Sequence, residues 1–478
     1  MKKSGIKVLA LFLSMALCLS LGGCGKEKTT SEKDGSNVGL IDFDDQTGSG
    51  FSSTDNSSGS GQTSNATISG SGETIKNRVE FDSKNPFSNI PKRLKGTTVK
   101  FAVWGDEGND KYKPLLTAFT RETGIKVQFV FIDQSNYASQ VMQNIVVGSA
   151  PDLIVSCENF ATLIEVTQPI EKLVNLDDDF WDKKVTQEAT INGHTYFVNS
   201  LKSIWENHEY VIFNKSLFSK NNLRSPRDYW ESGKWSYENA LKCMEEISKV
   251  DGLYGGLIAP NVLSASFGGP IVSYDPATKT FKNNITSAQT VKACQWFVNL
   301  YEKNIFGNGM ATSGFVNGNI GLTYGGVYSS KFNGWYSAMD GSLLDAVPLP
   351  TSIDGKATSQ VGTFRGYGIP KGAGNPEGAA YFLRYFLDYD YYKAAKINAF
   401  KSKTLENFYF KEFVPLIKKE GITFTHYQDA MLVANESADT FITLTDTTQA
   451  QVPTLLASKS NRVDDAVGKM NAKIKSYK

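Results

Sequence analysis

The sequence predicts an α/β protein in which mostly parallel sheets are flanked by helices and the chain forms two lobes. Strand and helix patterns alternate from Thr97 onward, which is typical of parallel sheets covered by helices. The 382 residues from Thr97 to Lys478 are too many for one hydrophobic core, so two compact lobes are expected. Apolar residues make up 40% of the chain and aromatic residues 12%, which is sufficient to fill two such cores.

The first 24 residues have the pattern of an export signal. Three lysines precede residues 8–21, which carry no charge. This apolar stretch is too short to span a bilayer as a stable helix, but it has the length and flanks of a secretory signal. It ends at Leu-Gly-Gly-Cys24, which resembles the lipobox of bacterial lipoproteins. The resemblance implies removal of residues 1–23, acylation of Cys24 with fatty acids such as palmitate, and attachment to the outer face of the cell membrane. The alternative is an ordinary signal peptide in which Cys24 has no role.

The segment after Cys24 is predicted to be a disordered tether. Between residues 46 and 72, 15 of 27 residues are Gly or Ser, and no Lys or Arg occurs in residues 34–72, so little apolar surface is available to offset the entropy of ordering. The roughly 70 residues before the body would span about 45–50 Å as a flexible coil. A neutral low-complexity insertion is the alternative. Apolar residues return in residues 80–96, which we expect to pack on the body as an N-terminal arm.

The first part of the body has the order strand, helix, strand, helix, strand. The predicted strands are residues 98–103, 127–132 and 152–155, and the predicted helices are residues 114–123 and 137–147. Gly124 and Gly148 are expected to end the two helices. Ligands of such sheets bind beyond the carboxyl ends of the strands, so residues 104–107 and 156–159 are expected beside one crevice. The later part continues in the same manner, with strands at 209–213 and 320–324 and helices at 291–303 and 377–389.

Charge and composition exclude several classes of function. The 50 Lys and Arg residues balance 49 Asp and Glu residues, so there is no basic field for nucleic acid. Beyond Cys24, the cysteines Cys157, Cys243 and Cys294 are odd in number and widely spaced, and the three histidines have no metal-ligand spacing. We therefore expect no disulfide framework, no metal and no cofactor. A glycoside hydrolase with two carboxylates is the enzymatic alternative, but acidic pairs are unavoidable at this composition and do not favour it.

A series of short motifs, in chain order, resembles the extracellular solute-binding proteins of ABC importers, in particular the carbohydrate type related to maltodextrin-binding protein. The motifs are residues 99–104 with 119–127 (FTRETGIKV), 148–154 (GSAPDLI), 191–198 (INGHTYFV), 211–218 (VIFNKSLF), 230–235 (WESGKW), 315–322 (FVNGNIGL), 347–350 (VPLP) and 368–372 (GIPKG). Each motif is weak alone, but in this order they are a strong signal, and the resemblance covers nearly the whole body, residues 97–478. Val198 stands where proline is usual and Gly321 where alanine is usual, and both departures leave the identity of the ligand open.

The resemblance implies a periplasmic-binding-protein-like fold of type II, with a ligand cleft between two lobes. Lobe 1 would comprise residues 97–200 and 366–420, and lobe 2 residues 201–365 and 421–478. The chain would cross between them near Ser200, within residues 362–366 and near Gly421. The protein would be a monomer without enzymatic activity that captures a sugar or oligosaccharide and delivers it to an ABC permease in a Gram-positive cell membrane. The alternatives are a surface-binding or sensor protein of the same fold, and a receptor for a non-sugar solute such as a peptide.

Sugars require aromatic platforms for their apolar faces and polar side chains for their hydroxyls. The candidate ligand-binding residues are Trp104, Asp106, Glu107, Glu158, Asn159, Trp205, Glu206, Tyr324, Tyr328, Trp335, Phe364 and Arg365. Structural roles are the alternatives: Trp104 would pack beneath its loop, Asn159 would cap a helix, and Arg365 would brace a hinge. The remaining large aromatics, Trp181, Trp230, Trp235 and Trp296, are expected to serve packing.

Overall fold

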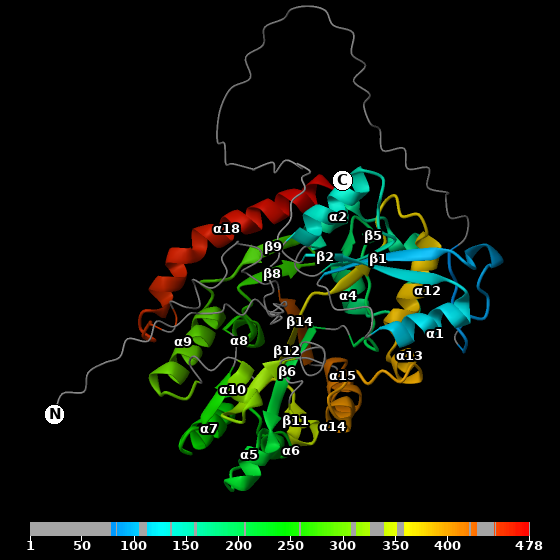
Figure 1. Cartoon of the computed structure of the whole chain (residues 1–478). Coiled ribbons are helices and arrows are strands. Elements are labelled where there is room, and N and C mark those ends of the chain that lie inside the picture. Colours follow the sequence, from blue (N-terminus) through cyan, green and yellow to red (C-terminus); the bar gives the residue numbers. More distant parts are fainter. Residues whose placement is uncertain are drawn as a thin grey trace, which may run out of the picture. The chain divides into compact units, whose positions relative to one another are not determined.

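The computed structural model describes the residues 78–82, 84–104, 112–133, 136–156, 160–204, 207–257, 260–306, 312–325, 339–350, 358–419, 422–427, 444 and 446–477 (Figure 1). The predicted signal peptide, Cys24 and the Gly/Ser-rich segment lie outside the described residues.

The first sheet contains the three strands predicted at the start of the body. The strands are β1 (Thr98–Trp104), β2 (Lys126–Ile132), β3 (Leu153–Ser156) and β13 (Gly366–Gly368), in the order β13-β3-β1-β2. β1 runs parallel to β2 and β3, and only β13 is antiparallel. The buried carboxylate of Asp152 accepts hydrogen bonds from the backbone N–H groups of Lys100 (2.8 Å) and Asn375 (2.6 Å). Asp152 thereby joins β1, the start of β3 and the helix that follows Asn375.

The helices that cover this sheet are α1 (Lys113–Thr123), α2 (Tyr137–Val146) and α12 (Pro376–Phe386). α1 ends at Gly124, which has the predicted left-handed conformation with φ of 76°. α12 differs from the amphipathic helix predicted at 377–389, because all of its residues from Glu377 to Phe386 are buried. One side of α12 packs on Phe101 in β1, and the other side packs on Phe87 in the N-terminal arm. α12 ends early because Asp388 caps a new helix, α13 (Tyr389–Ala394).

The second sheet is mixed rather than mostly parallel as predicted. Its strands are β6 (Asn207–Asn214), β7 (Tyr254–Leu257), β10 (Ile320–Gly325), β11 (Leu344–Val347), β12 (Thr358–Thr363) and β14 (Ile422–Tyr427). The order is β14-β12-β6-β10-β7, and β11 also pairs with β6. β12 and β14 are parallel, as are β10 and β7, but β6 runs antiparallel to β10, β11 and β12. Because β6 lies in the middle of the sheet and runs antiparallel to its neighbours, the sheet as a whole is mixed.

Helices, single turns and a small hairpin make up the remaining elements of both parts of the chain. The longer helices are α7 (Tyr237–Ser248), α9 (Ala288–Glu302) and α18 (Val452–Ser476). The shorter elements are α3 (Phe160–Leu163), α4 (Lys183–Glu188), α5 (Lys215–Lys220), α6 (Pro226–Glu231), α8 (Pro260–Ser266), β8 (Val272–Asp275), β9 (Thr280–Asn283), α10 (Thr312–Val316), α14 (Lys403–Asn407) and α15 (Val414–Ile417), together with the single turns η1 (Lys92–Leu94), η3 (Ile164–Val166), η4 (Ile170–Lys172) and η5 (Gly341–Leu343) and the π-helical η6 (Phe408–Phe413). α9 begins three residues earlier than predicted because the Ser287 hydroxyl accepts a hydrogen bond from the Thr290 N–H and caps the helix.

The motif at residues 191–198 forms a tight hairpin. β4 (Thr190–Ile191) and β5 (His194–Thr195) are joined by Asn192 and Gly193, whose φ angles are 52° and 81°. Two successive positive φ angles are the signature of a type I′ turn, which Asn-Gly favours.

The packing roles expected of cysteines and tryptophans are observed. Cys243 and Cys294 are buried free thiols, and burial raises the pKa of Cys294 to about 12. Trp181, Trp235 and Trp296 are buried. Cys157 lies outside the described residues.

We predict that the N-terminal arm contributes to the stability of the body through Phe87. Its side chain is 5% exposed, and its ring centroid lies 5.3 Å from those of Tyr385 and Tyr391. Phe87→Ala should lower the free energy of unfolding by about 3 kcal/mol, measured by urea denaturation. The control is Phe131→Ala, at a β2 position that is 37% exposed, and it should cost less. Equal losses for both variants would contradict a packed arm.

Candidate functional site

One edge of the first sheet collects several candidate positions. Trp104 is the last residue of β1 and lies opposite Ile132, the last residue of β2. β3 ends at Ser156, which pairs with Gly366 at the start of β13. The positions that follow β1 and β3 and the position that precedes β13 therefore share one edge. This edge is the carboxyl end of the parallel strands, where ligands of such sheets bind.

One edge of the second sheet collects the others. Asn207 at the start of β6 pairs with Thr363 at the end of β12, which pairs in turn with Tyr427 at the end of β14. On the other side of β6, Tyr324 near the end of β10 pairs with Val211. The residues that precede β6 and those that follow β10 are thus brought to the same edge.

The two edges meet because β12 continues into β13 through only two residues, Phe364 and Arg365. Both side chains are buried, with 1% and 6% of their surface exposed. A second connection between the sheets precedes β6, and it is bound to the first. The buried Asn199 donates a hydrogen bond from Nδ2 to the backbone oxygen of Arg365 (3.1 Å), and its Oδ1 accepts one from the N–H of Ser200 (2.8 Å). The two connections are held together at one buried point.

Close packing beside this point depends on glycine. A Cβ atom on Gly366 would lie 2.6 Å from the Cβ of Phe197, and one on Gly368 would lie 2.8 Å from the Phe197 ring. Neither distance is tolerable, so Phe197 requires both glycines. Beside it, Val198 donates its N–H to the oxygen of Tyr367 (3.0 Å). Proline, which is usual at that position in the resembling motif, has no N–H to donate, so Val198 supplies a bond that proline lacks.

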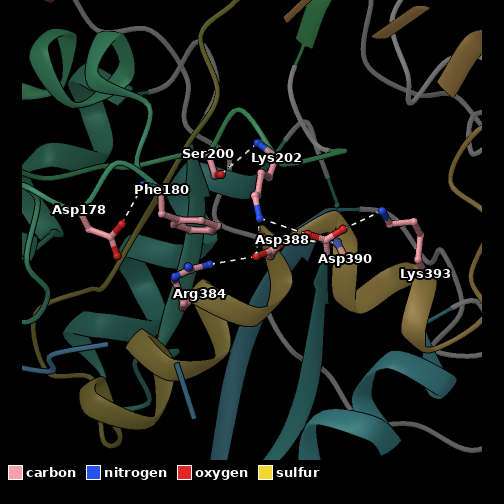
Figure 2. Close-up of polar contacts among 8 residues, drawn as sticks. All are labelled: Asp178, Phe180, Ser200, Lys202, Arg384, Asp388, Asp390 and Lys393. Atoms are coloured by element: carbon pink, nitrogen blue, oxygen red, sulfur yellow. Dashed lines mark hydrogen bonds and ion pairs between the residues drawn. The ribbon is translucent and has the colours of Figure 1, made fainter. Parts of the chain in front are cut away.

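A polar cluster anchors the connection that precedes β6 to the helices of the first sheet (Figure 2). Lys202 Nζ lies 3.2 Å from Asp390 Oδ2 and 3.5 Å from Asp388 Oδ2. Asp388 also pairs with Arg384 Nη1 at 3.2 Å, and the Arg384 guanidinium stacks on the ring of Phe180 at 3.3 Å. Burial lowers the pKa of Arg384, while Asp388 opposes that shift. The exposed pair of Lys202 and Asp390 adds little stability, whereas the buried pair of Arg384 and Asp388 fixes the carboxylate that Lys202 also approaches.

Most of the sequence-predicted ligand residues are not described. Phe364 and Arg365 are described, and their burial agrees with the alternative in which Arg365 braces the connection. For Trp104 and Tyr324, only the backbone positions at the two edges are described. The candidates that lie outside the described residues are Asp106, Glu107, Glu158, Asn159, Trp205, Glu206, Tyr328 and Trp335.

Glu209, a buried carboxyl group in β6, is not among the site residues that the sequence motifs predict. Its side chain is 3% exposed, and its Oε2 has no hydrogen-bond partner among the described residues. Burial raises the pKa of Glu209 from its usual value of 4.5 to about 8, which favours the neutral acid. The sequence signal was a lone acidic residue within an otherwise apolar strand pattern. The neighbouring His208 points to the opposite face of β6, where its Nδ1 lies 3.0 Å from the hydroxyl of Tyr409.

Within the described ranges, no three His, Cys, Asp or Glu side chains lie close enough to hold a metal ion. The helices of those ranges also include none with the length and apolar content needed to cross a bilayer.

Comparison with protein families gives one match. A model described as bacterial extracellular solute-binding protein matches residues 115–398, which is more than half of the 478 residues. No curated protein matches the chain.

Several solved structures resemble the chain over most of its length. An extracellular solute-binding protein from Staphylococcus aureus in complex with maltose is 16% identical, with a TM-score of 0.57; the match covers 78% of this chain and 98% of that protein. The cyclic α-maltosyl-1,6-maltose binding protein from Arthrobacter globiformis is 14% identical, with a TM-score of 0.55 and coverage of 80% and 100%. An ABC substrate-binding protein from Listeria monocytogenes in complex with cycloalternan is 14% identical, with a TM-score of 0.54 and coverage of 79% and 99%. At these identities the likeness shows the fold, and it confirms the predicted α/β binding-protein class.

We predict that Glu209 makes stability depend on pH. A carboxyl group with a pKa of 4.5 when unfolded and about 8 when folded contributes stability that is fully present below pH 4.5 and is lost as the pH rises through about 8. The free energy of unfolding should therefore fall between these values, by up to about 1.4 kcal/mol per pH unit. Glu209→Gln should remove that slope in urea titrations at pH 5, 6, 7 and 8. Glu238→Gln, at an exposed position of α7, should keep the dependence of the free energy of unfolding on pH. If both variants show the same slope, Glu209 is not the group responsible.

Proposed function

Because the chain belongs to the bacterial extracellular solute-binding proteins, a non-enzymatic family, we propose that it captures a sugar or oligosaccharide between its two sheets and delivers it to an ABC permease. The observation that carries this proposal is the meeting of the two sheet edges at Phe364 and Arg365. Side chains from both edges can reach one ligand only where the edges meet. The family membership supplies the role of solute capture.

The choice of a sugar rests on chemistry and on the relatives of the same fold. Aromatic side chains stack on the apolar faces of sugar rings, and we place Trp104 from the first edge and Tyr324 from the second in this role. Three of the similar structures come from proteins bound to, or named for, maltose-type or related oligosaccharides. The acidic and amide candidates near the same edges would accept hydrogen bonds from the hydroxyl groups.

We propose two lobes, one around each sheet, that move about the connections between them. One connection precedes β6 and includes residues 199–204, and another is the pair Phe364 and Arg365. The sequence patterns place a third near Gly421. However, Arg227 on α6 pairs with Glu412 at 2.6 Å and with Asp345 in β11 at 2.9 Å. Glu412 precedes Gly421 in the chain and already contacts α6, on the side of the second sheet. This contact supports a third connection that lies earlier in the chain, between α13 and α14.

We further propose that the protein is a monomeric lipoprotein on the outer face of the cell membrane. Removal of residues 1–23 would leave Cys24 as the first residue and the site of acylation. Stable attachment requires more than one acyl chain, because a single chain gives only marginal and reversible binding. The Gly/Ser-rich segment would then act as the tether that brings the body within reach of the permease.

We predict that a sugar will stabilise the protein and that this effect depends on the two aromatic candidates. A ligand at 100 times its dissociation constant adds about 2.7 kcal/mol, which raises the melting temperature by a few degrees. A thermal-shift screen should cover mono-, di- and oligosaccharides, amino acids and short peptides. Trp104→Ala and Tyr324→Ala should weaken the response, whereas the control Trp230→Ala, at a partly buried position in α6, should keep it.

The screen separates the alternatives. A shift only with amino acids or peptides would support a receptor function and contradict the choice of a sugar as the ligand. The absence of any shift would favour a surface-binding or sensor protein. Unchanged affinity in both aromatic variants would discard the proposed site.

We also predict that Cys24→Ser releases the protein from the membrane. In cells grown with labelled palmitate, the wild-type protein should be labelled and should sediment with membranes. The variant should be unlabelled and should appear in the medium. Membrane retention of an unlabelled variant would contradict lipid anchoring.

A further inference from the structure

The C-terminal helix α18 is attached along most of its length to the second sheet's side of the molecule (Figure 1). It lies against β9 and α9, which contact β14 and β12 through β8 and α8. The Asn471 side chain exchanges two hydrogen bonds with the backbone of Phe281 in β9, at 2.7 and 3.0 Å. Asn283 Nδ2 donates to the backbone oxygen of Ser460 at 3.2 Å. The body of the helix is therefore fixed to β9 and α9.

The last turn of α18 contacts the first sheet's side instead. Lys473 Nζ donates to Thr162 Oγ1 at 3.1 Å, and the Tyr477 hydroxyl donates to the backbone oxygen of Ala161 at 2.8 Å. Both acceptors belong to α3, which is the first described helix after β3. Asn192 in the β4–β5 turn donates from Nδ2 to the backbone oxygen of Tyr477 at 2.6 Å.

We propose that this last turn positions α3 for ligand binding and couples it to the second sheet, an inference that rests on the proposed binding function. α3 has only four residues, so its backbone oxygens depend on partners outside the helix, as the Leu163 oxygen does on Thr167 Oγ1 at 2.6 Å. Tyr477 supplies such a partner from outside. α3 follows the carboxyl end of β3, at the edge where the candidate ligand residues gather. A displacement of α3 would therefore move that edge.

The coupling follows from the attachment of the two parts of α18. The residues that hold α3 lie at the end of a helix whose preceding turns contact β9 and α9. A change in the angle between the two sheets must either carry α3 along or break the bonds of Lys473 and Tyr477. The position of α3 thus depends on the arrangement of both sheets, although in the sequence α3 follows a strand of the first sheet only.

The test compares the double variant Lys473→Met, Tyr477→Phe with the wild-type protein and with Ser460→Ala. Ser460→Ala is the matched control, because it removes a hydroxyl on the same helix that accepts a hydrogen bond from Asn283 in β9 and donates one to Asp464. Hydrogen–deuterium exchange is measured over α3 and over β9. The loss of hydrogen bonds worth about 0.5–1.5 kcal/mol should accelerate exchange in α3 by about threefold to tenfold in the double variant, with no change in β9.

Affinity is measured with maltose, mannotriose and tagatose by calorimetry. For the sugar that binds the wild-type protein, the dissociation constant of the double variant should rise by about threefold to tenfold, while Ser460→Ala binds as the wild type does. Unchanged exchange in α3, unchanged affinity or tighter binding would each overturn the positioning role. If none of the three sugars binds the wild-type protein, the sugar assignment fails, and the exchange of α3 still decides whether α18 holds it.

Discussion

The hydrogen bond from Asn199 to the backbone oxygen of Arg365 is the constraint on which the arrangement of the two sheets depends. It joins the connection that precedes β6 to the connection between β12 and β13. A buried carbonyl oxygen without a hydrogen-bond partner would cost about 1–3 kcal/mol of folding free energy, so loss of the bond from the Asn199 side chain would destabilise the fold. Phe197 packs against Gly366 and Gly368 on the same strand, which leaves no space for the strand to shift sideways. The connections therefore behave as one pivot.

If one sheet is to move about this pivot, the connection must be attached firmly to the other sheet. The polar cluster around Asp388 serves that purpose, because it fixes Lys202 to the junction of α12 and α13 (Figure 2). The buried pair of Arg384 and Asp388 is costly to desolvate, and breaking one partner would leave a buried charge. Such pairs specify an arrangement more than they stabilise it. The cluster therefore marks the point at which the connection leaves the helices of the first sheet.

The sequence predicted the local elements well and the long-range ones poorly. Alternation and the glycines at 124 and 148 located β1, β2, β3 and α1 because these features depend on neighbouring residues. The antiparallel position of β6 and the complete burial of α12 were missed, because both depend on partners far away in the sequence. For the site, the rule that ligands bind at the carboxyl ends of strands put residues 104–107 and 156–159 beyond β1 and β3, and their role in binding stays a prediction. It could not identify Asn199 or Glu209, whose roles follow from burial and not from a motif.

The same geometry explains why ligand affinity should depend on residues that never touch the ligand. A ligand shifts the angle between the sheets only by as much as it binds one arrangement better than another. Any contact that favours one arrangement therefore adds to, or subtracts from, the free energy of binding. Under the proposed function, the pivot at Asn199 would restrict the accessible arrangements, and the contacts of the last turn of α18 would depend on them. Under the proposed function, affinity would thus be set at three places, namely the two sheet edges, the pivot that joins them, and the helix α18 that contacts α3, β9 and α9.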